Sequence, residues 1–469
     1  MRTARWGLLA VVSSALLIAG CKGSKEPDAA TSGHPDPGTL PPDHTWGEAD
    51  ELPFAVEYHV RPPGETYGIG DGSSWTDALS DLPAELERGA RYYLASGTYY
   101  AGAAEAYDVY HRFADPEAGD EYIAVVKATA TNHGSDDGWE EAFATGPAEL
   151  GPIELVTGRY VIDGQVGSGQ AGYGFHLTTT DCANEQAKVV RFPWDAESHH
   201  IILRHLDLEH CGDLPDTQPP HDVIYGNIPV SHVKLQSCYV HDANRTLFLM
   251  RGFDDVLIED CHFARSGRLQ EVSSINPGDS SNLTIRRNVF EDTEQTFISL
   301  RGVDNVRIYS NVFHSRLDDW QIYSAIENTG GAAAWHVYVY GNTFYDLQGL
   351  NTGIRLQDET DDIRVFNNLW AGCRTNQIML TGEHDYNAFH DNWREEGASY
   401  LIDERIEEPN VQVLSEDPFV DAAAGDFHLA APTAAGTVLP TPYDVDLDQN
   451  QRGADGVWDR GAHEYAASD

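Results

Sequence analysis

The stretch that decides the fold is Leu283-Thr284-Ile285-Arg286-Arg287-Asn288, and a similar phrase returns at Val306-Arg307-Ile308-Tyr309-Ser310-Asn311. Each phrase alternates apolar and polar side chains and ends on an anchor residue, after which further apolar residues follow. Alternation with a period of two residues is typical of a β-strand. The phrase recurs between about residues 200 and 370, with anchors at 206, 238, 261, 288, 311, 342 and 368, spaced 23 to 32 residues apart. Irregular repeats of this length, built from strands, indicate a solenoid.

The anchor column carries information of its own. Four successive repeats place asparagine there: Asn288, Asn311, Asn342 and Asn368. Asparagine tolerates left-handed backbone, so we expect the anchor to form the bend between one sheet and the next. Stacked amides also hydrogen-bond along the stack. Cys238 and Cys261 occupy the same column and predict a stacked pair of buried thiols, with a disulfide as the alternative; we expect the other cysteines of the body to be buried packing residues.

The charge of the chain excludes some partners. The 469 residues contain 75 Asp plus Glu against 30 Lys plus Arg, a formal net charge of -45. Such a surface repels phosphate backbones and anionic lipid, which excludes nucleic-acid binding and electrostatic docking on membranes. The charge is uneven, because residues 240–320 have a balance of -4 and residues 401–469 a balance of -12. An anionic polymer is therefore best tolerated near the central repeats, whereas carboxylate-rich surface suits Ca²⁺.

The first residues predict export. Arg2 and Arg5 precede an apolar run, Trp6–Ile18, that is too short to span a bilayer and has the charge order of a secretory signal. The run leads into Cys21 through Ala19-Gly20, which resembles the bacterial lipobox, and this resemblance implies a lipid on Cys21 after cleavage. We therefore expect a signal peptide at 1–20 and a proline-rich tether at 21–52, which would place the protein at a bacterial outer membrane or cell surface, held there by the lipid alone.

A second strand in each repeat supplies a row of polar residues. Alignment of these strands predicts that Met250, Ile275, Leu300, Ile326, Leu356 and Leu380 point inward. The residue after each would then point outward as a row: Arg251, Asn276, Arg301, Glu327, Gln357 and Thr381. Arg251 and Arg301 would lie two strands apart, about 10 Å. An arginine fork binds carboxylate or sulfate through two hydrogen bonds, so the row predicts a site for neighbouring acidic sugars, with a merely solvated face as the alternative.

Other stretches resemble one known family of proteins. Gly70–Trp75, Arg91–Tyr99 and Tyr160–Gly164 look like the cap and early coils of the right-handed parallel β-helix, or pectate-lyase-like, proteins of secreting bacteria. The stretch from Asp417 to Ala462 is similar to a closing module of such proteins. The resemblance implies an all-β, right-handed parallel β-helix with capped ends, over residues 53–415, followed by a closing segment at 416–469. The fold alone does not give the activity, because β-helices host lyases, hydrolases, epimerases and adhesins.

Part of the polar row resembles the alginate and chondroitin lyase family more narrowly. In that family a glutamate binds Ca²⁺, a lysine five residues later is the base, and an arginine one coil further assists. Glu271 and Arg301 match the glutamate and the arginine, which implies a calcium ligand at Glu271, but Asn276 stands at the lysine position. Proton abstraction beside a uronate carboxylate needs a base and neutralisation of that carboxylate. Another group must then supply the base, or the site only binds.

Several further side chains are candidates. His241, His262, Asp292 and His314 follow the anchor phrase by a few residues and predict a cluster on one edge. Of these, His241 and His314 are candidate bases and Asp292 a candidate metal ligand. We assign substrate contacts to the polar side chains Asn276, Glu327, Arg355 and Gln357 and to the aromatic Trp320. For hydrolysis, two carboxylates must flank the bond, and Asp318, Asp319 or Glu327 could supply them.

These observations lead to one principal hypothesis and two alternatives. The principal hypothesis is a monomeric, surface-anchored enzyme that cleaves an acidic polysaccharide by β-elimination, with Ca²⁺ as its cofactor. Arg301 and Arg251 would neutralise the uronate, and the base is unassigned. The first alternative is a non-catalytic glycan-binding or structural β-helix, and the second is a glycoside hydrolase.

Overall fold

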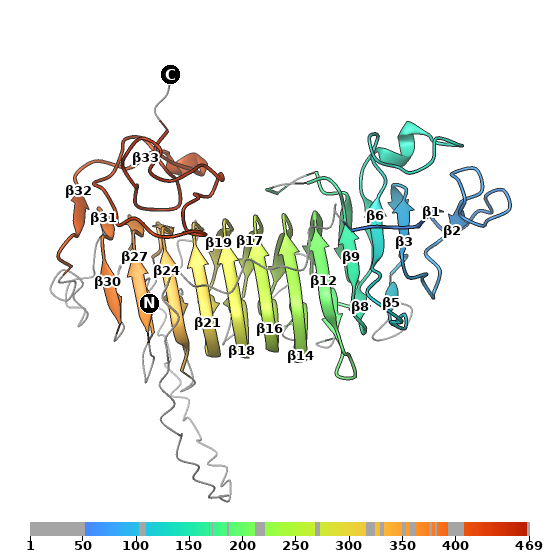
Figure 1. Cartoon of the computed structure of the whole chain (residues 1–469), viewed down its shortest axis with the longest axis horizontal. Helices are drawn as coiled ribbons and strands as arrows, with labels where there is room; N and C mark the ends of the chain where they lie inside the picture. The colour runs from blue at the N-terminus through green and yellow to red at the C-terminus, as the bar shows by residue number, and fades with distance from the viewer. Residues whose placement is uncertain are drawn as a thin grey trace, which may run out of the picture. The chain divides into compact units, whose positions relative to one another are not determined.

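The computed structural model consists of parallel strands arranged in coils, and each complete coil adds one strand to each of three faces (Figure 1). It describes residues 52–102, 109–167, 169–170, 172–184, 187–211, 221–267, 273–315, 324–328, 333–348, 353–356, 362–374, 378–379, 382–392 and 408–466. Apart from the 3-10 turns η2 (Glu141–Ala144) and η3 (Ala422–Ala424), the regular elements in these ranges are strands. The fold is the right-handed parallel β-helix that the sequence predicts.

The first and second faces merge where a strand runs through the bend between them. Strands β14 (Asp222–Gln236), β16 (Thr246–Glu259) and β18 (Ser273–Arg286) contribute their first halves to the first face and their second halves to the second. The remaining first-face strands are β5 (His111–Phe113), β8 (Ile153–Leu155), β11 (Val190–Phe192), β20 (Thr296–Ser299), β23 (Ser324–Glu327), β26 (Ile354–Arg355) and β29 (Ile378–Met379).

The second face holds the strands drawn in front in Figure 1. Besides the second halves already named, they are β1 (Val56–Arg61), β3 (Ala90–Leu94), β6 (Ile123–Lys127), β9 (Tyr160–Asp163), β12 (His199–Arg204), β21 (Arg301–Tyr309), β24 (Trp335–Tyr340), β27 (Ile363–Phe366) and β30 (Glu383–Asp385). The short strand β2 (Leu79–Ser80) pairs with β1 at the N-terminal end.

The third face is a separate sheet. Its strands are β4 (Gly97–Thr98), β7 (Ala148–Leu150), β10 (Phe175–Thr178), β13 (Leu206–Glu209), β15 (Tyr239–Ala243), β17 (His262–Ser266), β19 (Val289–Thr293), β22 (Val312–His314), β25 (Thr343–Tyr345), β28 (Leu369–Ala371), β31 (Ala388–His390) and β32 (Gln412–Leu414). Its inward side chains form a stack of rings 4.6 to 5.3 Å apart: Phe263, Phe290, Phe313, Phe344, Trp370 and Phe389. Equivalent positions in successive strands face the same way, so one aromatic per coil produces this stack.

The asparagine column forms the predicted ladder between the second and third faces. Asn311 shows the pattern: its Nδ2 donates to the carbonyls of Ile285 and Tyr309 and to Oδ1 of Asn342, each at 3.0 Å. Its Oδ1 accepts from the backbone N–H of Asn288 at 2.9 Å. The ladder extends one coil beyond the predicted set, because Asn387 continues it and is itself bound by the carboxylate of Glu408.

The left-handed bend lies one residue before the predicted anchor. Positive φ values occur at Asp260 (55°), Arg287 (54°), Ser310 (53°) and Asn367 (60°), each of which directly precedes an anchor residue. The prediction that the anchor itself makes the bend was therefore wrong. The anchor side chain points into the interior, where its amide satisfies buried backbone groups of its own coil and the previous one.

The cysteines divide into two kinds. Cys238, Cys261 and Cys373 are buried thiols, and the backbone N–H of Cys238 points at the sulfur of Cys261 (3.3 Å), which agrees with a stacked pair. Cys182 and Cys211 instead form a disulfide, with their Cα atoms 5.8 Å apart. The prediction that both are simple packing residues was wrong, because each follows the third-face strand of its own coil, β10 or β13, and adjacent coils bring the two together.

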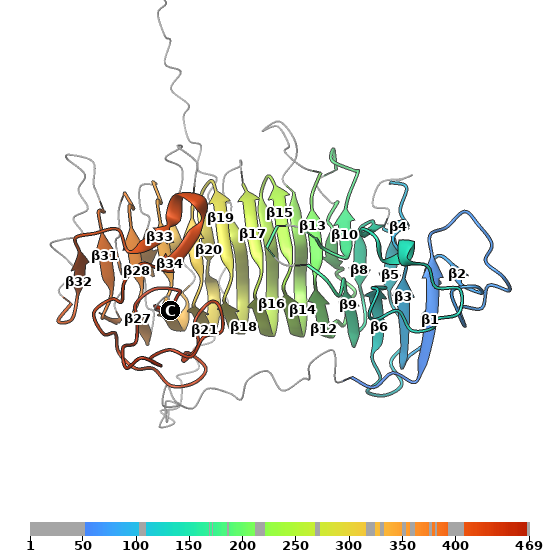
Figure 2. The ribbon, with the colours of Figure 1, turned by 90° about the horizontal axis from the view of Figure 1, so that it is seen from above.

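The closing segment covers the outer side of the third face at its later coils. Strands β33 (Phe419–Asp421) and β34 (Asp426–Leu429) pair antiparallel, and Figure 2 shows them lying over this end of the sheet. Phe419, Phe427 and Leu429 pack there on outward apolar residues of the coils, such as Val312, Leu369 and Ala388. Hydrogen bonds from Ser310 to the carbonyl of Val445 and from Ala462 to Oγ1 of Thr343 fix the segment to the coils.

No helix among the described residues is long and apolar enough to cross a membrane.

Candidate functional site

The predicted pair of arginines lies in one column where the first face passes into the second. The register pairs Arg251 with Gly278 and Gly278 with Arg301. Two strand spacings therefore separate the arginine backbones, about 10 Å. A Cβ at Gly278 would lie 3.2 Å from Cγ of Arg251, so the side chain of Arg251 extends across the glycine. Arg251 is exposed and Arg301 half-buried, so two cations occur in one column with the buried Gly278 between them.

The rest of the predicted row belongs to a neighbouring column. Asn276 pairs with Leu249 rather than with Arg251, and Glu327 pairs with Ser299 and Arg355. The predicted single row of Arg251, Asn276, Arg301 and Glu327 was therefore wrong by a slip of two residues. Because side chains alternate with a period of two, such a slip leaves every residue on its predicted side of the sheet, and the apolar pattern cannot reveal it.

Glu327 is the notable carboxylate of this face. It is 7% exposed, and its Oε1 accepts a hydrogen bond from Thr296 at 3.0 Å. Burial raises the carboxyl pKa of Glu327 above its usual range, although hydrogen bonds from Thr296 and Ser324 and the charges of Arg355 and Arg301 oppose the rise. A buried carboxyl whose pKa is raised and which lies beside two arginines is a candidate for proton transfer.

Several predicted residues cannot be placed. Glu271, Trp320, Gln357 and Cys21 lie outside the described residues, as do Asp318 and Asp319. For Asn276 the backbone in β18 is described and the side chain is not. Their roles stay predictions.

The predicted histidine cluster lies on the outer side of the third face. The ring of His241 is held between two carboxylates, with Nε2 2.7 Å from Asp207 and Nδ1 2.5 Å from Asp242. Arg265 binds Asp242 through Nε and Nη2, both at 2.6 Å. Burial would lower the pKa of His241, but the hydrogen bonds and charges of Asp207 and Asp242 outweigh it and raise that pKa. His241 thus belongs to a hydrogen-bonded network of charged groups with both ring nitrogens engaged, and its role as a base stays a prediction.

A second histidine held between two carboxylates lies on the same face, in β10, toward the N-terminal end. His176 has Nδ1 2.6 Å from Glu149 and Nε2 3.3 Å from Glu209. The hydrogen bond to Glu209, reinforced by Glu149 against the effect of burial, raises the pKa of His176 to about 9. The outer side of the third face therefore carries two histidines, His176 and His241, whose neighbouring carboxylates favour the protonated ring.

The predicted metal ligand Asp292 and candidate base His314 also belong to this face. Asp292 has a left-handed backbone (φ 51°), and its Oδ1 accepts a hydrogen bond from Ser315 at 3.2 Å. Among the described residues, Asp292 belongs to no group of three side chains close enough to share an ion. The role of Asp292 as a metal ligand therefore stays a prediction, as does that of Glu271. His314 pairs in register with Glu291 and lies beside Phe427 of the closing segment.

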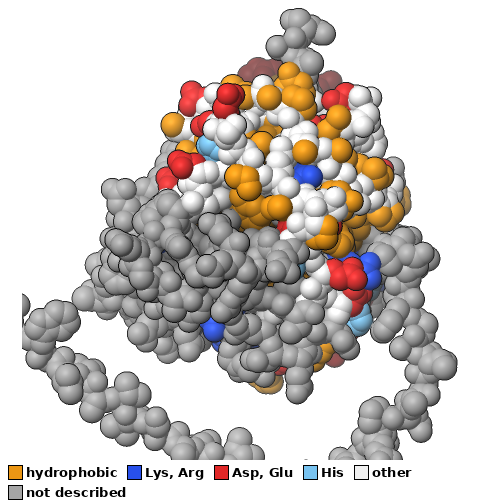
Figure 3. Space-filling view, turned by 90° about the vertical axis from the view of Figure 1, so that its left-hand side faces the viewer, with side chains coloured by type: hydrophobic (Ala, Val, Ile, Leu, Met, Phe, Trp, Pro, Cys, Tyr) orange, Lys and Arg blue, Asp and Glu red, His pale blue; other side chains and the backbone are white. Residues whose placement is uncertain are grey.

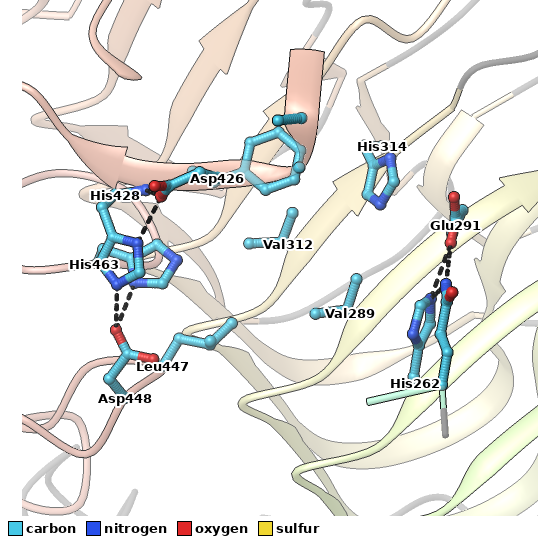
Figure 4. A pocket seen from close by; sticks show the side chains of 14 residues that line it. His262, Val289, Glu291, Val312, His314, Asp426, His428, Leu447, Asp448 and His463 are labelled. Carbon is cyan, nitrogen blue, oxygen red and sulfur yellow. Dashed lines mark hydrogen bonds and ion pairs between the residues drawn. The ribbon is translucent and has the colours of Figure 1, made fainter. Parts of the chain in front are cut away.

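A pocket of about 540 Å³ opens where the closing segment overhangs the third face. Val289 and Val312 line it between two polar walls (Figure 4). One wall is His262 with Glu291, whose Nε2 and Oε2 are 3.1 Å apart, and Gln170 from the β9–β10 connection also binds Glu291 at 2.8 Å. The opposite wall comes from the closing segment.

That opposite wall contains residues that sequence reasoning missed. Nε2 of His428 and Nδ1 of His463 lie 2.9 and 3.0 Å from the same oxygen of Asp448. Nδ1 of His428 lies 2.6 Å from Asp426. Burial would lower the pKa of His428, but Asp426 and Asp448 outweigh it and raise that pKa. The three residues have no motif spacing, and only the histidine two residues after an aspartate in Asp426-Phe427-His428 could have drawn notice.

The fold and these surfaces define a right-handed parallel β-helix protein with a folded closing segment. A family model described as a right handed beta helix region matches residues 226–394. No curated protein sequence matches the chain.

Solved structures resemble the chain at low sequence identity. Pectate lyase Pel9A is 13% identical over 89% of this chain and 98% of its own, with a TM-score of 0.37. XylC, in a complex with xylose, is 10% identical over 87% and 98%, with a TM-score of 0.44. PfbA, a surface adhesin of Streptococcus pneumoniae, is 11% identical over 72% and 84%, with a TM-score of 0.37. Such likeness concerns the fold and transfers no activity to this chain.

Proposed function

We propose that the protein binds an acidic polysaccharide along the first face and cleaves it by β-elimination. The observation that carries the proposal is the column of Arg251, Gly278 and Arg301, in which two arginines lie two strands apart and the Arg251 side chain extends across the glycine between them. Each guanidinium would take one carboxylate or sulfate of the polymer through paired hydrogen bonds. Neutralisation of a uronate carboxylate also lowers the cost of removing the proton beside it.

Glu327 is the group that we propose for the proton transfer. Its carboxyl is next to the arginine column, and its raised pKa makes it a better base than an ordinary glutamate. Asn276 stands where the lyases that this chain resembles have their catalytic lysine, and an asparagine cannot act as the base. Glu327, which lies in the column next to Arg251 and Arg301, would supply the base instead. Ca²⁺, bound through Glu271, remains part of the proposal.

The test is incubation of the purified protein with a panel of polyuronates and sulfated glycans. Ultraviolet absorbance from unsaturated sugar ends establishes elimination. New reducing ends without that absorbance indicate a hydrolase, and binding without any product indicates a glycan-binding protein. Addition of a chelator, followed by Ca²⁺, tests the cofactor.

Variants separate binding from chemistry. Loss of one bidentate, charge-assisted contact costs about 1.5–3 kcal/mol, so Arg251→Ala and Arg301→Ala should each weaken binding about 10- to 100-fold. Glu327→Gln should remove product formation and leave affinity nearly unchanged. Arg364→Ala is the matched control, because Arg364 lies on the second face and pairs with Asp362 at 2.9 Å. Wild-type affinity in Arg301→Ala would refute the assignment of the site.

We also propose that a lipid on Cys21 holds the protein at a bacterial outer membrane or cell surface. Apolar Trp6–Ile18 and the small residues before Cys21 support this proposal. Mass spectrometry of the membrane-extracted protein tests it, since Cys21→Ser should lose the acyl mass and leave the membrane fraction.

A further inference from the structure

The pocket wall built by the closing segment brings three metal-ligating side chains together. The ligand atoms of His428, Asp448 and His463 all lie within 4.8 Å of one another. The rings of the two histidines lie close, with their centroids 4.3 Å apart. None of the three belongs to the first-face column proposed to bind polysaccharide, so this is a separate site.

The backbone holds these residues in place. The N–H of Leu447 donates to the carbonyl of Ala462 at 2.9 Å, which joins the neighbours of Asp448 and His463 directly. The fully buried carboxylate of Asp446 adds a second connection, because it accepts from the N–H of Glu464 at 2.9 Å and from that of Asn450 at 2.7 Å. His428 follows in β34, which packs in the same apolar cluster as Ala462. The site is therefore pre-formed on ordered backbone.

Asp426 orients His428 for coordination. Its carboxylate takes the Nδ1–H of His428 at 2.6 Å, which leaves Nε2 directed at Asp448. A carboxylate on the second ring nitrogen is the usual outer partner of a metal-bound histidine, because it fixes the tautomer and strengthens the ligand.

We propose that His428, Asp448 and His463 bind a divalent transition-metal ion, with Zn²⁺ as the best fit. Two imidazoles and one carboxylate are typical ligands of Zn²⁺, whereas Ca²⁺ takes oxygen ligands alone. Ligands bonded to tetrahedral zinc at about 2.0 Å lie about 3.3 Å apart. The nitrogen–oxygen distances of 2.9 and 3.0 Å are within a few tenths of an ångström of that spacing, and all three ligand atoms lie within 4.8 Å of one another.

The three ligands lie in the wall of the pocket, so an ion bound to them could also bind a ligand there. All three residues line the pocket, so a fourth coordination position is open to water or to an anionic ligand in the pocket. Figure 4 places His262 and Glu291 on the opposite wall, across Val289 and Val312. The surrounding charge favours a cation: residues 401–469 have a balance of -12, and Figure 3 shows acidic side chains with little visible basic surface at this end.

Titration of Zn²⁺ into the chelator-treated full chain tests the proposal. We expect one ion to bind with micromolar or lower Kd and to raise the thermal midpoint. Asp448→Asn should weaken that binding at least 100-fold. His428→Gln should do the same without unfolding the protein, since its side chain is 53% exposed. Asp426→Asn, which keeps all three ligands, should weaken binding about 10-fold.

The control is His176→Gln, which removes a histidine held between two carboxylates elsewhere on the third face and should leave zinc binding unchanged. Co²⁺ in place of Zn²⁺ gives an absorption spectrum that reports four-coordination. The proposal is overturned if the full chain binds no Zn²⁺ below millimolar concentration, or if the bound ion survives both His428→Gln and Asp448→Asn. Either result identifies the three side chains as a hydrogen-bonded cluster, with any zinc adventitious.

Discussion

Replacement of Asn311 by alanine should open the stack of coils locally. The change removes three hydrogen bonds that Nδ2 donates and those that Oδ1 accepts from Asn288, and every partner is buried. The backbone N–H of Asn288 loses its acceptor. A buried group left without a partner costs about 1–3 kcal/mol, and each lost net hydrogen bond about 1 kcal/mol. The free energy of unfolding should fall by about 3–5 kcal/mol.

Hydrogen exchange followed by mass spectrometry measures this loss coil by coil. A decrease of about 4 kcal/mol corresponds to roughly a thousandfold faster exchange in the two coils that flank residue 311, with the N-terminal coils little changed. Asn311→Asp should lower the free energy of unfolding more than Asn311→Ala does, because it directs a buried carboxylate at the carbonyls of Ile285 and Tyr309.

Asn410→Ala is the control, because Asn410 is exposed and its amide binds the carboxylate of Asp385 at the surface. Exchange in that variant should match the wild type. The reasoning is refuted if Asn311→Ala retains wild-type protection, or if Asn311→Asp is tolerated as well as alanine, since either result would mean that the amide ladder does not hold the coils together.

Three further predictions follow from the described contacts. Gly278→Leu should push Arg251 aside and weaken polysaccharide binding about tenfold by calorimetry, and an unchanged Kd would contradict a role for the present position of Arg251 in binding. The raised pKa of His176 adds stability that is complete below pH 6.5 and lost as pH rises through about 9, so urea unfolding should show about 1–2 kcal/mol less stability at high pH, and His176→Gln should remove that difference. Joint replacement of Cys182 and Cys211 by serine should lower the free energy of unfolding by about 2–4 kcal/mol, and no change in the urea midpoint would show that the bond adds no stability.

The fold was predictable because its main determinants repeat. Alternating apolar residues specify strands, and an asparagine at successive coil boundaries from Asn288 onward specifies the ladder, so the same physical requirement appears many times along the chain. The backbone conformation of the residue before each anchor could not be predicted. Arg287 and Ser310 adopt left-handed backbone although neither is glycine or asparagine, because the coil on either side determines their conformation.

The candidate sites were predictable only in part. Arg251 and Arg301 were found because both follow apolar strand residues, whereas the two-residue slip beside them leaves no trace in the apolar pattern. The wall of His428, Asp448 and His463 could not be derived, because its members are brought together by irregular backbone packed on the coils. The same is true of Cys182 and Cys211, whose proximity depends on the length of the coil between them.

The placement of the closing segment has an evolutionary consequence. A coil duplicated upstream of β9 would lengthen the outer surface of the third face by one strand spacing, about 4.8 Å, and leave the pocket, with Gln170 in its wall, intact. A coil inserted between β22 and β25 would instead separate Ser310 from Thr343, two of the residues to which the segment is hydrogen-bonded. The chain is thus free to vary in length at one end and constrained at the other, so homologues should differ in coil number before the pocket and agree after it.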